Sequence, residues 1–408
     1  MLVLVLPLLW QDTTRLDAGT ALARALERAP VAAAVAARSR AADALGRDAG
    51  RLRNLQLGVS AENLGMQRQV TGKDGLAGTE GQVTLQTVLP LGGDLGAARR
   101  GAAAHLAMVQ SDGAVTLAGL TGQLLAAMAS HDLGHQLLAA AAAESDALDR
   151  FAAALTARVA DGRSPAGEGA RVRTEAVLVA SQLARRRAEL AAADAQLAVA
   201  LGLAPETPLR ITLPTSCEAS GAGGVGVDQQ RAAAKRAFAE ALADQAGARR
   251  VPDLVPQVGF RRTAGFSGVL VGLAIDLPFF SSGSAALASA RAEVDAATAE
   301  VAQADQESAA AIAASRRTLQ ELDVAGARYA AGWDADLTQA VTAAEARWRE
   351  GQGTLAELFD ARRARLAALE EHATWRGRRV ATRIALARAL GQPLTAALLR
   401  EDCPGAPR

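Results

Sequence analysis

The chain has 408 residues; half of them are hydrophobic but only 3% are aromatic, and 44 basic residues balance 43 acidic ones to a net charge of +1. Compact enzymes of this length normally use bulky aromatic side chains as core anchors, so an alanine-rich chain favours long helices that touch through small residues. The balanced charge argues against a nucleic-acid-binding protein, because such proteins neutralise phosphates with an excess of basic side chains.

The N-terminus is an apolar run from Met1 to Trp10 that is interrupted by Pro7. We expect residues 1–16 to be a truncated secretory signal, which lacks the usual positively charged beginning and a clear cleavage site. A buried or frayed N-terminus is the alternative. No later segment reaches the roughly 18 uninterrupted apolar residues of a membrane-spanning helix.

Two strands are predicted next. Apolar side chains alternate with period two in the segments Leu55–Glu62 and Val83–Leu89, and the second segment ends at Pro90. This alternation is typical of a strand. The residues between them, 71–81, are rich in glycine, lysine and aspartate, so we expect a hairpin.

A very long helix follows the first hairpin. The 68 residues from Asp94 to Asp161 contain no proline, and at about 1.5 Å per residue they would extend for roughly 100 Å. Apolar and small residues recur every seven positions from Leu117 to Val159, alternating in steps of three and four, which is coiled-coil spacing. A return helix is predicted over about residues 166–201, so the pair forms an antiparallel hairpin with a turn at Gly162.

A glycine-rich segment, residues 215–227, separates the two halves of the chain. Gly221, Gly223 and Gly226 have the spacing of a dinucleotide-binding loop. That motif requires a strand directly before it, and Pro214 and Cys217 stand there instead, so we expect a flexible linker. A disulfide between Cys217 and Cys403, the only cysteines, is left open.

The second half repeats the first. Strands are predicted at Val255–Arg262 and Val271–Leu277, and helices at about residues 284–350 and 355–390. Three residues of the first half have counterparts in the second: Pro90, Gly162 and Gly202 correspond to Pro278, Gly351 and Gly391. Successive members are 72 and 40 residues apart in the first half and 73 and 40 residues apart in the second.

The duplication divides the chain into five parts. These are the signal segment 1–16, a first repeat 17–214, the linker 215–227, a second repeat 228–394 and a C-terminal tail 395–408. Four strands with exposed edges are not stable as an isolated sheet. We therefore expect them to close with other copies, and three chains would give a twelve-stranded barrel.

His131 and His135 are spaced as two metal ligands on one face of a helix. His131 falls in the coiled-coil seam, however, and Asp132, which points elsewhere on the helix, is the only further candidate seen nearby. We therefore predict no metal site. The sequence shows no Ser–His–Asp set, no paired carboxylates at a strand end and no phosphate-binding loop, so we expect neither an enzyme nor a cofactor.

A duplicated unit of two strands, a giant helix, a turn and a return helix resembles the TolC-like outer membrane efflux family, over about residues 16–394. The most specific matches are at the turns, where Arg347, Gly351 and Glu357 repeat Arg158, Gly162 and Glu168. The resemblance implies a mainly α-helical protein with a β-barrel part, in which three protomers form a twelve-stranded barrel and a twelve-helix periplasmic tunnel. A narrower resemblance to the heavy-metal (CzcC-like) subgroup rests on Ser60–Asn63 and Leu277–Phe280.

The resemblance also implies a function. The chain would be a passive, homotrimeric export duct in the outer membrane of a Gram-negative bacterium, in contact with outer membrane lipid and carrying small molecules or metal cations. A periplasmic adaptor and an inner membrane pump of the RND type would deliver the cargo. The alternative is a periplasmic coiled-coil adaptor or scaffold, which would carry a single helical hairpin.

Family likeness assigns roles to particular residues. Four residues would lie at the periplasmic tips, where the adaptor docks: Arg158, Gly162, Arg347 and Gly351. Three acids would form a lumenal ring that attracts cations: Glu168, Glu357 and Asp360. The alternative for these acids is an ordinary solvated helix start, which the helix dipole favours. Gly353 occupies a position where family members with locked tips carry a basic residue.

Overall fold

The computed structural model describes residues 14–62, 80–162, 164–213, 223–263, 266–277, 282–329 and 332–400. Within this part of the chain two compact units are present. Unit 1 comprises the described residues within the ranges Met1–Ala33, Val115–Val227 and Glu307–Arg408, and unit 2 those within Ala34–Ala114 and Asp228–Gln306. Most of the expected signal segment, most of the linker and both cysteines lie outside the described residues.

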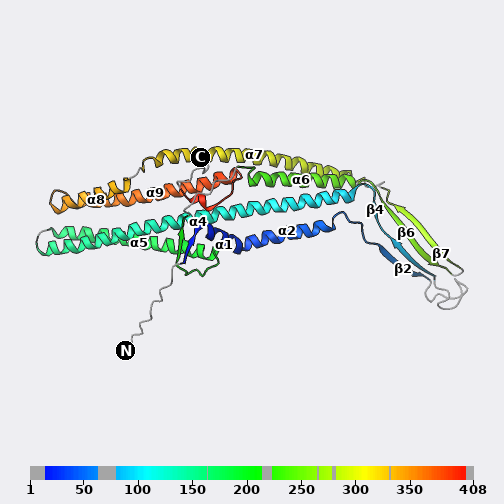
Figure 1. Cartoon of the computed structure of the whole chain (residues 1–408), viewed down its shortest axis with the longest axis horizontal. Coiled ribbons are helices and arrows are strands. Elements are labelled where there is room, and N and C mark those ends of the chain that lie inside the picture. Colours follow the sequence, from blue (N-terminus) through cyan, green and yellow to red (C-terminus); the bar gives the residue numbers. More distant parts are fainter. Residues whose placement is uncertain are drawn as a thin grey trace, which may run out of the picture. The chain divides into compact units, whose positions relative to one another are not determined.

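Unit 2 contains an antiparallel sheet (Figure 1). Its strands are β2 (Gln56–Glu62), β3 (Glu80–Gln86), β6 (Asp253–Arg262) and β7 (Ser267–Ile275), and the two-residue β4 (Leu89–Pro90) adds to one end of β6. The order β2-β3-β6-β7 confirms the two predicted hairpins, and the pairing of β3 with β6 joins the two copies. The sheet therefore has five strands and not four, although β4 is only a short extension.

Helices α2 (Pro30–Asp48) and α6 (Val227–Ala248), neither of which was predicted, precede β2 and β6 in the chain. In unit 2, α6 contacts the beginning of α7 (Ser284–Gly326) through an ion pair in which Lys235 Nζ lies 2.7 Å from Glu300 Oε2. It also contacts α4 (Asp94–Ala160) through Arg100 and Asp244, at 3.1 Å. Each strand hairpin is thus preceded by a helix, so the duplicated unit includes this helix as well as the strands and the helical hairpin.

Helix α4 confirms the predicted giant helix almost residue for residue. Among the described residues it is also the one helix whose length and apolar composition would allow it to cross a membrane. Core helices of soluble proteins share that property, and here alanine supplies much of the apolar character. With α5 (Ala166–Ala200) it forms the first hairpin, and α8 (Trp333–Arg349) forms the second with α9 (Leu355–Ala389) (Figure 1).

The prediction of one continuous helix over residues 284–350 was wrong, because α7 ends at Gly326 and α8 begins at Trp333. The indole of Trp375 packs directly on Gly326, where a Cβ atom would lie 2.4 Å from the ring. Trp375 Nε1 also donates a hydrogen bond to the carbonyl of Leu322, at 2.7 Å. Gly332 then adopts a left-handed φ of 102° before α8 begins, a conformation that favours glycine.

The main core of unit 1 surrounds a small parallel sheet of β1 (Thr14–Asp17) and β5 (Leu209–Thr212). Helix α1 (Ala18–Arg28) and the 3-10 helix η2 (Ala396–Leu399) pack on it together with apolar residues of α4, α5 and α9. Leu398 and Leu399 are only 4% and 3% exposed. Residues 14–16, placed with the signal segment, and residues 396–399, placed in the tail, are thus part of the folded core.

A second core cluster fills the end of the two hairpins. Leu155 of α4, Val172 of α5 and Leu358 of α9 are each no more than 1% exposed there. Phe151 and Trp348 meet with ring centroids 4.6 Å apart. Three aromatic side chains, Phe151, Trp348 and Phe359, therefore lie where the two hairpins meet.

Candidate functional site

One face of the sheet in unit 2 carries apolar side chains in rows that cross all four long strands. Because successive side chains of a strand point to opposite faces, the strand register sets which residues share a row. The rows are Val59, Val83, Phe260 and Val269, and then Leu57, Leu85, Val258 and Val271. All eight are exposed, between 37% and 81%.

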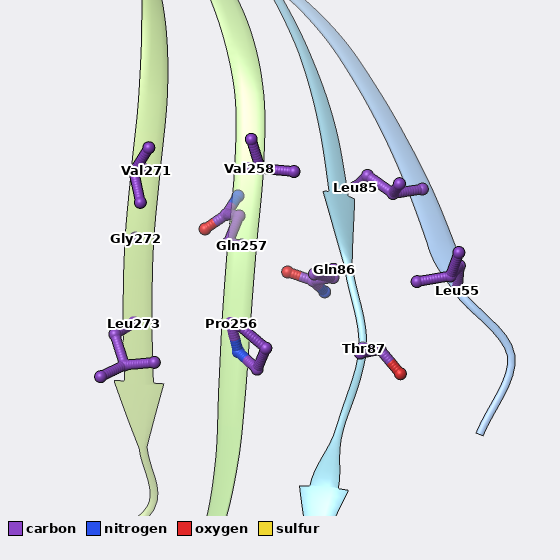
Figure 2. A pocket seen from close by; sticks show the side chains of 10 residues that line it. All are labelled: Leu55, Leu85, Gln86, Thr87, Pro256, Gln257, Val258, Val271, Gly272 and Leu273. Carbon is purple, nitrogen blue, oxygen red and sulfur yellow. The ribbon is translucent and has the colours of Figure 1, made fainter. Parts of the chain in front are cut away.

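Figure 2 shows part of this face. Leu85, Val258, Val271 and Leu273 come from three neighbouring strands and line a shallow groove. No other segment of the described chain covers these side chains, as their exposure shows. Apolar patches of this extent on a protein surface mark contact with another protein or with a membrane.

The opposite face of the same strands is mostly polar or small, apart from Val255 and Leu270. Gln56 and Gln86 lie in one of its rows, and the Gln86 amide donates a hydrogen bond to the Gln56 side chain at 3.0 Å. Gly259 lies in the next row, where a Cβ atom would come within 2.5 Å of the Val83 carbonyl. The sheet is therefore amphipathic, and its apolar side is the one without cover.

Both edges of the sheet are open within the described residues, since β2 pairs only with β3 and β7 pairs only with β6. One open edge is β2, with 7 residues, and the other is β7, with 9 residues. Each presents backbone groups without a partner strand. Long apolar edge strands aggregate unless another strand pairs with them. The sheet as it stands in one chain is thus an incomplete structure.

The hairpin tips contain the glycines that the sequence singled out. Gly162 has a φ of 71° and Gly351 a φ of 76°, and nothing lies within 4 Å of the Cβ position of either. After Gly351, the amides of Gln352 and Gly353 both donate to the carbonyl of Arg347, at 2.8 and 3.1 Å. The two glycines therefore form tight turns at the ends of α4 and α8.

The two arginines of the repeated motif have different surroundings. Arg158 places its guanidinium over the ring of Trp348, 4.8 Å from the centroid, so it connects the first hairpin to the second by a cation–π contact. Arg347 remains within its own turn, with Nη2 3.6 Å from Glu357 Oε2. The duplication has conserved the residue type while the contacts have diverged between the copies.

The three acids assigned to a ring lie at helix starts. Glu168 is in the first turn of α5 and Glu357 in the first turn of α9, where Thr354 caps the helix by accepting a hydrogen bond from the Glu357 amide. Asp360 is 73% exposed and lies 3.6 Å from Arg363. Glu357 and Asp360 thus each have an arginine nearby. The structure of a single protomer is compatible with an acidic ring in the lumen and equally with solvated helix starts.

Sequence reasoning missed an ion network that joins the two hairpins above the tips. Arg362 of α9 donates to Glu144 of α4 at 2.8 Å and lies 3.3 Å from Glu345 of α8. A second ion pair joins α9 to α5: Arg186 of α5 lies 2.7 Å from Glu370 of α9, and the hydrogen bond to this carboxylate raises the pKa of Arg186. The only sequence signal for these contacts is the series of arginines along α9, and it does not indicate which acidic residues of other helices they meet.

The prediction that His131 and His135 have no further ligand near them apart from Asp132 was wrong. Asp194 of α5 lies against both, and three ligand atoms of His131, His135 and Asp194 fall within 4.8 Å of one another. The hairpin brings Asp194 there from 63 residues away in sequence. Burial and the neighbouring His131 lower the pKa of His135, and Arg210 acts in the same direction, whereas Asp194 and Asp132 oppose them.

The comparisons with known proteins agree with this architecture. Residues 228–392 match the family described as outer membrane efflux protein. The outer membrane protein VceC from Vibrio cholerae has the same fold with a TM-score of 0.77 and 21% identity, over 92% of this chain and 96% of that one. No curated protein sequence matches this chain.

Two further structures of channels are similar. The open state of the MtrE outer membrane channel of Neisseria gonorrhoeae gives a TM-score of 0.68 at 18% identity, covering 93% of this chain and 90% of that one. CusC, which has been described in terms of transmembrane channel formation, gives 0.74 at 19% identity and covers 93% of each chain. The predicted fold, mainly α-helical with a sheet suited to a trimeric barrel, is confirmed.

Proposed function

We propose that this chain, whose residues 228–392 belong to the outer membrane efflux protein family, is one protomer of a homotrimeric efflux channel. The channel lies in the outer membrane of a Gram-negative bacterium and extends into the periplasm. It is the passive duct of a tripartite system and has no catalytic role. Substrates pass through it after an inner membrane pump has supplied the energy.

The observation that carries this proposal is the uncovered apolar face of the sheet together with its two open edges. Outer membrane barrels point apolar side chains toward lipid and polar ones toward the lumen, and closure removes every edge. Three copies of the β2-β3-β6-β7 sheet, joined edge to edge, would make a barrel of twelve strands. The row from Leu57 to Val271 would then contact lipid, and Gln56 and Gln86 would face the lumen.

The helical hairpins supply the periplasmic part of the duct. We assign adaptor docking to the tips at Arg158, Gly162, Arg347 and Gly351, and a lumenal acidic ring to Glu168, Glu357 and Asp360. The adaptor would be a periplasmic protein that bridges to a pump of the RND type. Small molecules and metal cations are the candidate cargoes.

A coiled-coil scaffold without a channel fits less well, since it needs neither a second hairpin nor an apolar sheet. The part of the chain that the structure describes forms two helical hairpins and two strand hairpins, and the strand hairpins are joined in one sheet. Nothing in a scaffold would cover the apolar rows of that sheet.

The test begins with expression of the full chain, with an export signal, in a Gram-negative host and separation of its membranes by density. We expect the protein in the outer membrane fraction, extractable only with detergent, as a trimer by native mass spectrometry. Reconstituted in a planar bilayer, it should give discrete conductance steps. A compact monomer that remains soluble without detergent, or a trimer without conductance, would overturn the proposal.

A further inference from the structure

His131, His135 and Asp194 form a side-chain cluster in unit 1 that the proposed channel does not require. The two histidines lie one turn apart on α4, and Asp194 faces them from α5. Their rings meet edge to face with centroids 4.5 Å apart. His131 is 1% exposed, whereas His135 and Asp194 are 22% and 21% exposed, so water can reach the cluster from one side.

The hydrogen bonds of His131 determine which of its nitrogens carries the proton. The backbone amide of Ile211, on β5, donates to His131 Nε2 at 3.3 Å. A neutral imidazole has one N–H, so the proton is on Nδ1, which donates to Asp194 Oδ1 at 2.6 Å. His131 therefore holds one carboxylate oxygen of Asp194 in place and has no free lone pair.

His135 is in the opposite situation. Its Nε2 atom is buried without a hydrogen-bond partner. The nearest carboxylate oxygen, Asp194 Oδ2, lies 3.8 Å away, which is too far for a hydrogen bond. An imidazole nitrogen and a carboxylate oxygen are thus close neighbours with no hydrogen bond between them.

The spacing of these two atoms suits binding to a single metal ion. Zinc binds imidazole nitrogen and carboxylate oxygen with bonds of about 2.1 Å each, so one ion can span about 4.2 Å, which is more than the 3.8 Å observed. A carboxylate ligand held by a second residue is typical of metal sites.

We propose that His135 Nε2 and Asp194 Oδ2 bind a divalent transition-metal ion, with Zn²⁺ as the representative, and that His131 is a positioning residue for the carboxylate. Water completes the coordination on the exposed side. The ion joins α4 to α5 beside β5 and so stabilises the first hairpin. This inference concerns one hairpin and does not depend on the proposed channel activity.

The test uses the full-length protein in detergent, stripped of metal with a chelator, dialysed and titrated with Zn²⁺ by calorimetry. We expect one Zn²⁺ per chain, and at least a tenfold loss of affinity in His135→Gln and in Asp194→Asn. Asp194→Asn retains an oxygen that can accept the His131 hydrogen bond, so it should fold. The matched control is His105→Gln, because His105 is also on α4 but packs against Phe238, and its affinity should equal that of the original protein.

A second measurement separates loss of the site from loss of the fold. Zn²⁺ should raise the unfolding temperature of the original protein and of His105→Gln, because a ligand of the native state stabilises it, and should leave that of His135→Gln unchanged. Absence of stoichiometric binding to the original protein would overturn the assignment. So would binding by His135→Gln and Asp194→Asn with unchanged affinity.

Discussion

Arg362 of α9 and Glu144 of α4 form an ion pair at 2.8 Å in which the side chains are only 7% and 6% exposed. The pair links a helix of the second repeat to the giant helix of the first. Glu345 of α8 lies 3.3 Å from the same guanidinium. A single buried arginine therefore contacts three helices of unit 1, and it reaches both of its carboxylate partners only while both hairpins are in place.

Replacing this arginine should destabilise unit 1 strongly. Arg362→Met leaves Glu144 buried without its cation, whereas Glu345 keeps its ion pair with Arg349. Breaking a buried pair in this way typically costs about 3–5 kcal/mol. Adding Glu144→Met should recover part of the loss, because an apolar pair needs no compensation. Unfolding in denaturant, followed by circular dichroism, measures both variants. Arg47→Met, which breaks an exposed pair with Asp43, serves as control and should change stability by at most about 1 kcal/mol; equal effects at the two sites would contradict the prediction.

The turn glycines should tolerate no side chain. Gly162→Ala forces an alanine into a left-handed conformation and should cost about 1 kcal/mol or more, although nothing lies close to the Cβ position. Gly167→Ala, five residues further on at the same tip, has the same open surroundings but helical backbone and should be neutral or slightly stabilising. Thermal unfolding of the two variants, measured side by side, tests whether backbone conformation alone makes the difference. If both behave alike, the left-handed turn is not what the position requires.

The two faces of the sheet should respond oppositely to charge. Val271→Lys places an ammonium group on the apolar face, where a lysine near the middle of a bilayer costs about 2–4 kcal/mol, and should reduce the amount of trimer in the outer membrane. Gln86→Lys places the same group on the polar face and should be tolerated. Quantitative blotting of trimer from purified outer membranes compares the variants at equal expression. Equal losses, or a greater loss for Gln86→Lys, would mean that the apolar face does not contact lipid.

The acidic ring predicts a change in cation block. Substituting Glu357 and Asp360 together by alanine should weaken block of single-channel current by divalent or trivalent cations in planar bilayers, because three protomers would lose six carboxylates at one level. Asp336→Ala, an exposed acid in the first turn of α8, is the control and should leave block unchanged. Arg347 and Arg363 lie close to the two acids, so neutralising these arginines while keeping the acids should strengthen cation block. Unchanged block in the double variant would assign the acids to solvated helix starts.

Local pattern predicted most of the architecture. The strand hairpins before Pro90 and Pro278, the helix from Asp94 and the turns at Gly162 and Gly351 all follow from periodicity and from residues with special backbone preferences. Such signals depend on neighbours within a few positions, so they survive in a single sequence. Because the unit is duplicated, each of these patterns occurs twice, and the corresponding prolines and glycines align the two halves.

The contacts between distant segments could not be predicted. The pairing of β1 with β5 joins residues 195 positions apart. Trp375 of another helix packs on Gly326, where α7 ends, in the space that a side chain would need. Asp194 meets His131 only because α5 folds back along α4. Sequence periodicity indicates which face of a helix is apolar but not which residue of a partner helix lies opposite it.

The sequence by itself thus determined the repeated unit of strand pair and helical hairpin, since alternation and heptad spacing are properties of neighbouring residues. Only the tertiary structure decided which residues meet across the hairpins: Arg362 with Glu144, Arg158 with Trp348, and Asp194 with the two histidines. Those meetings depend on the axial offset between packed helices. That offset is set by the sum of many small contacts along the interface and is encoded at no single position.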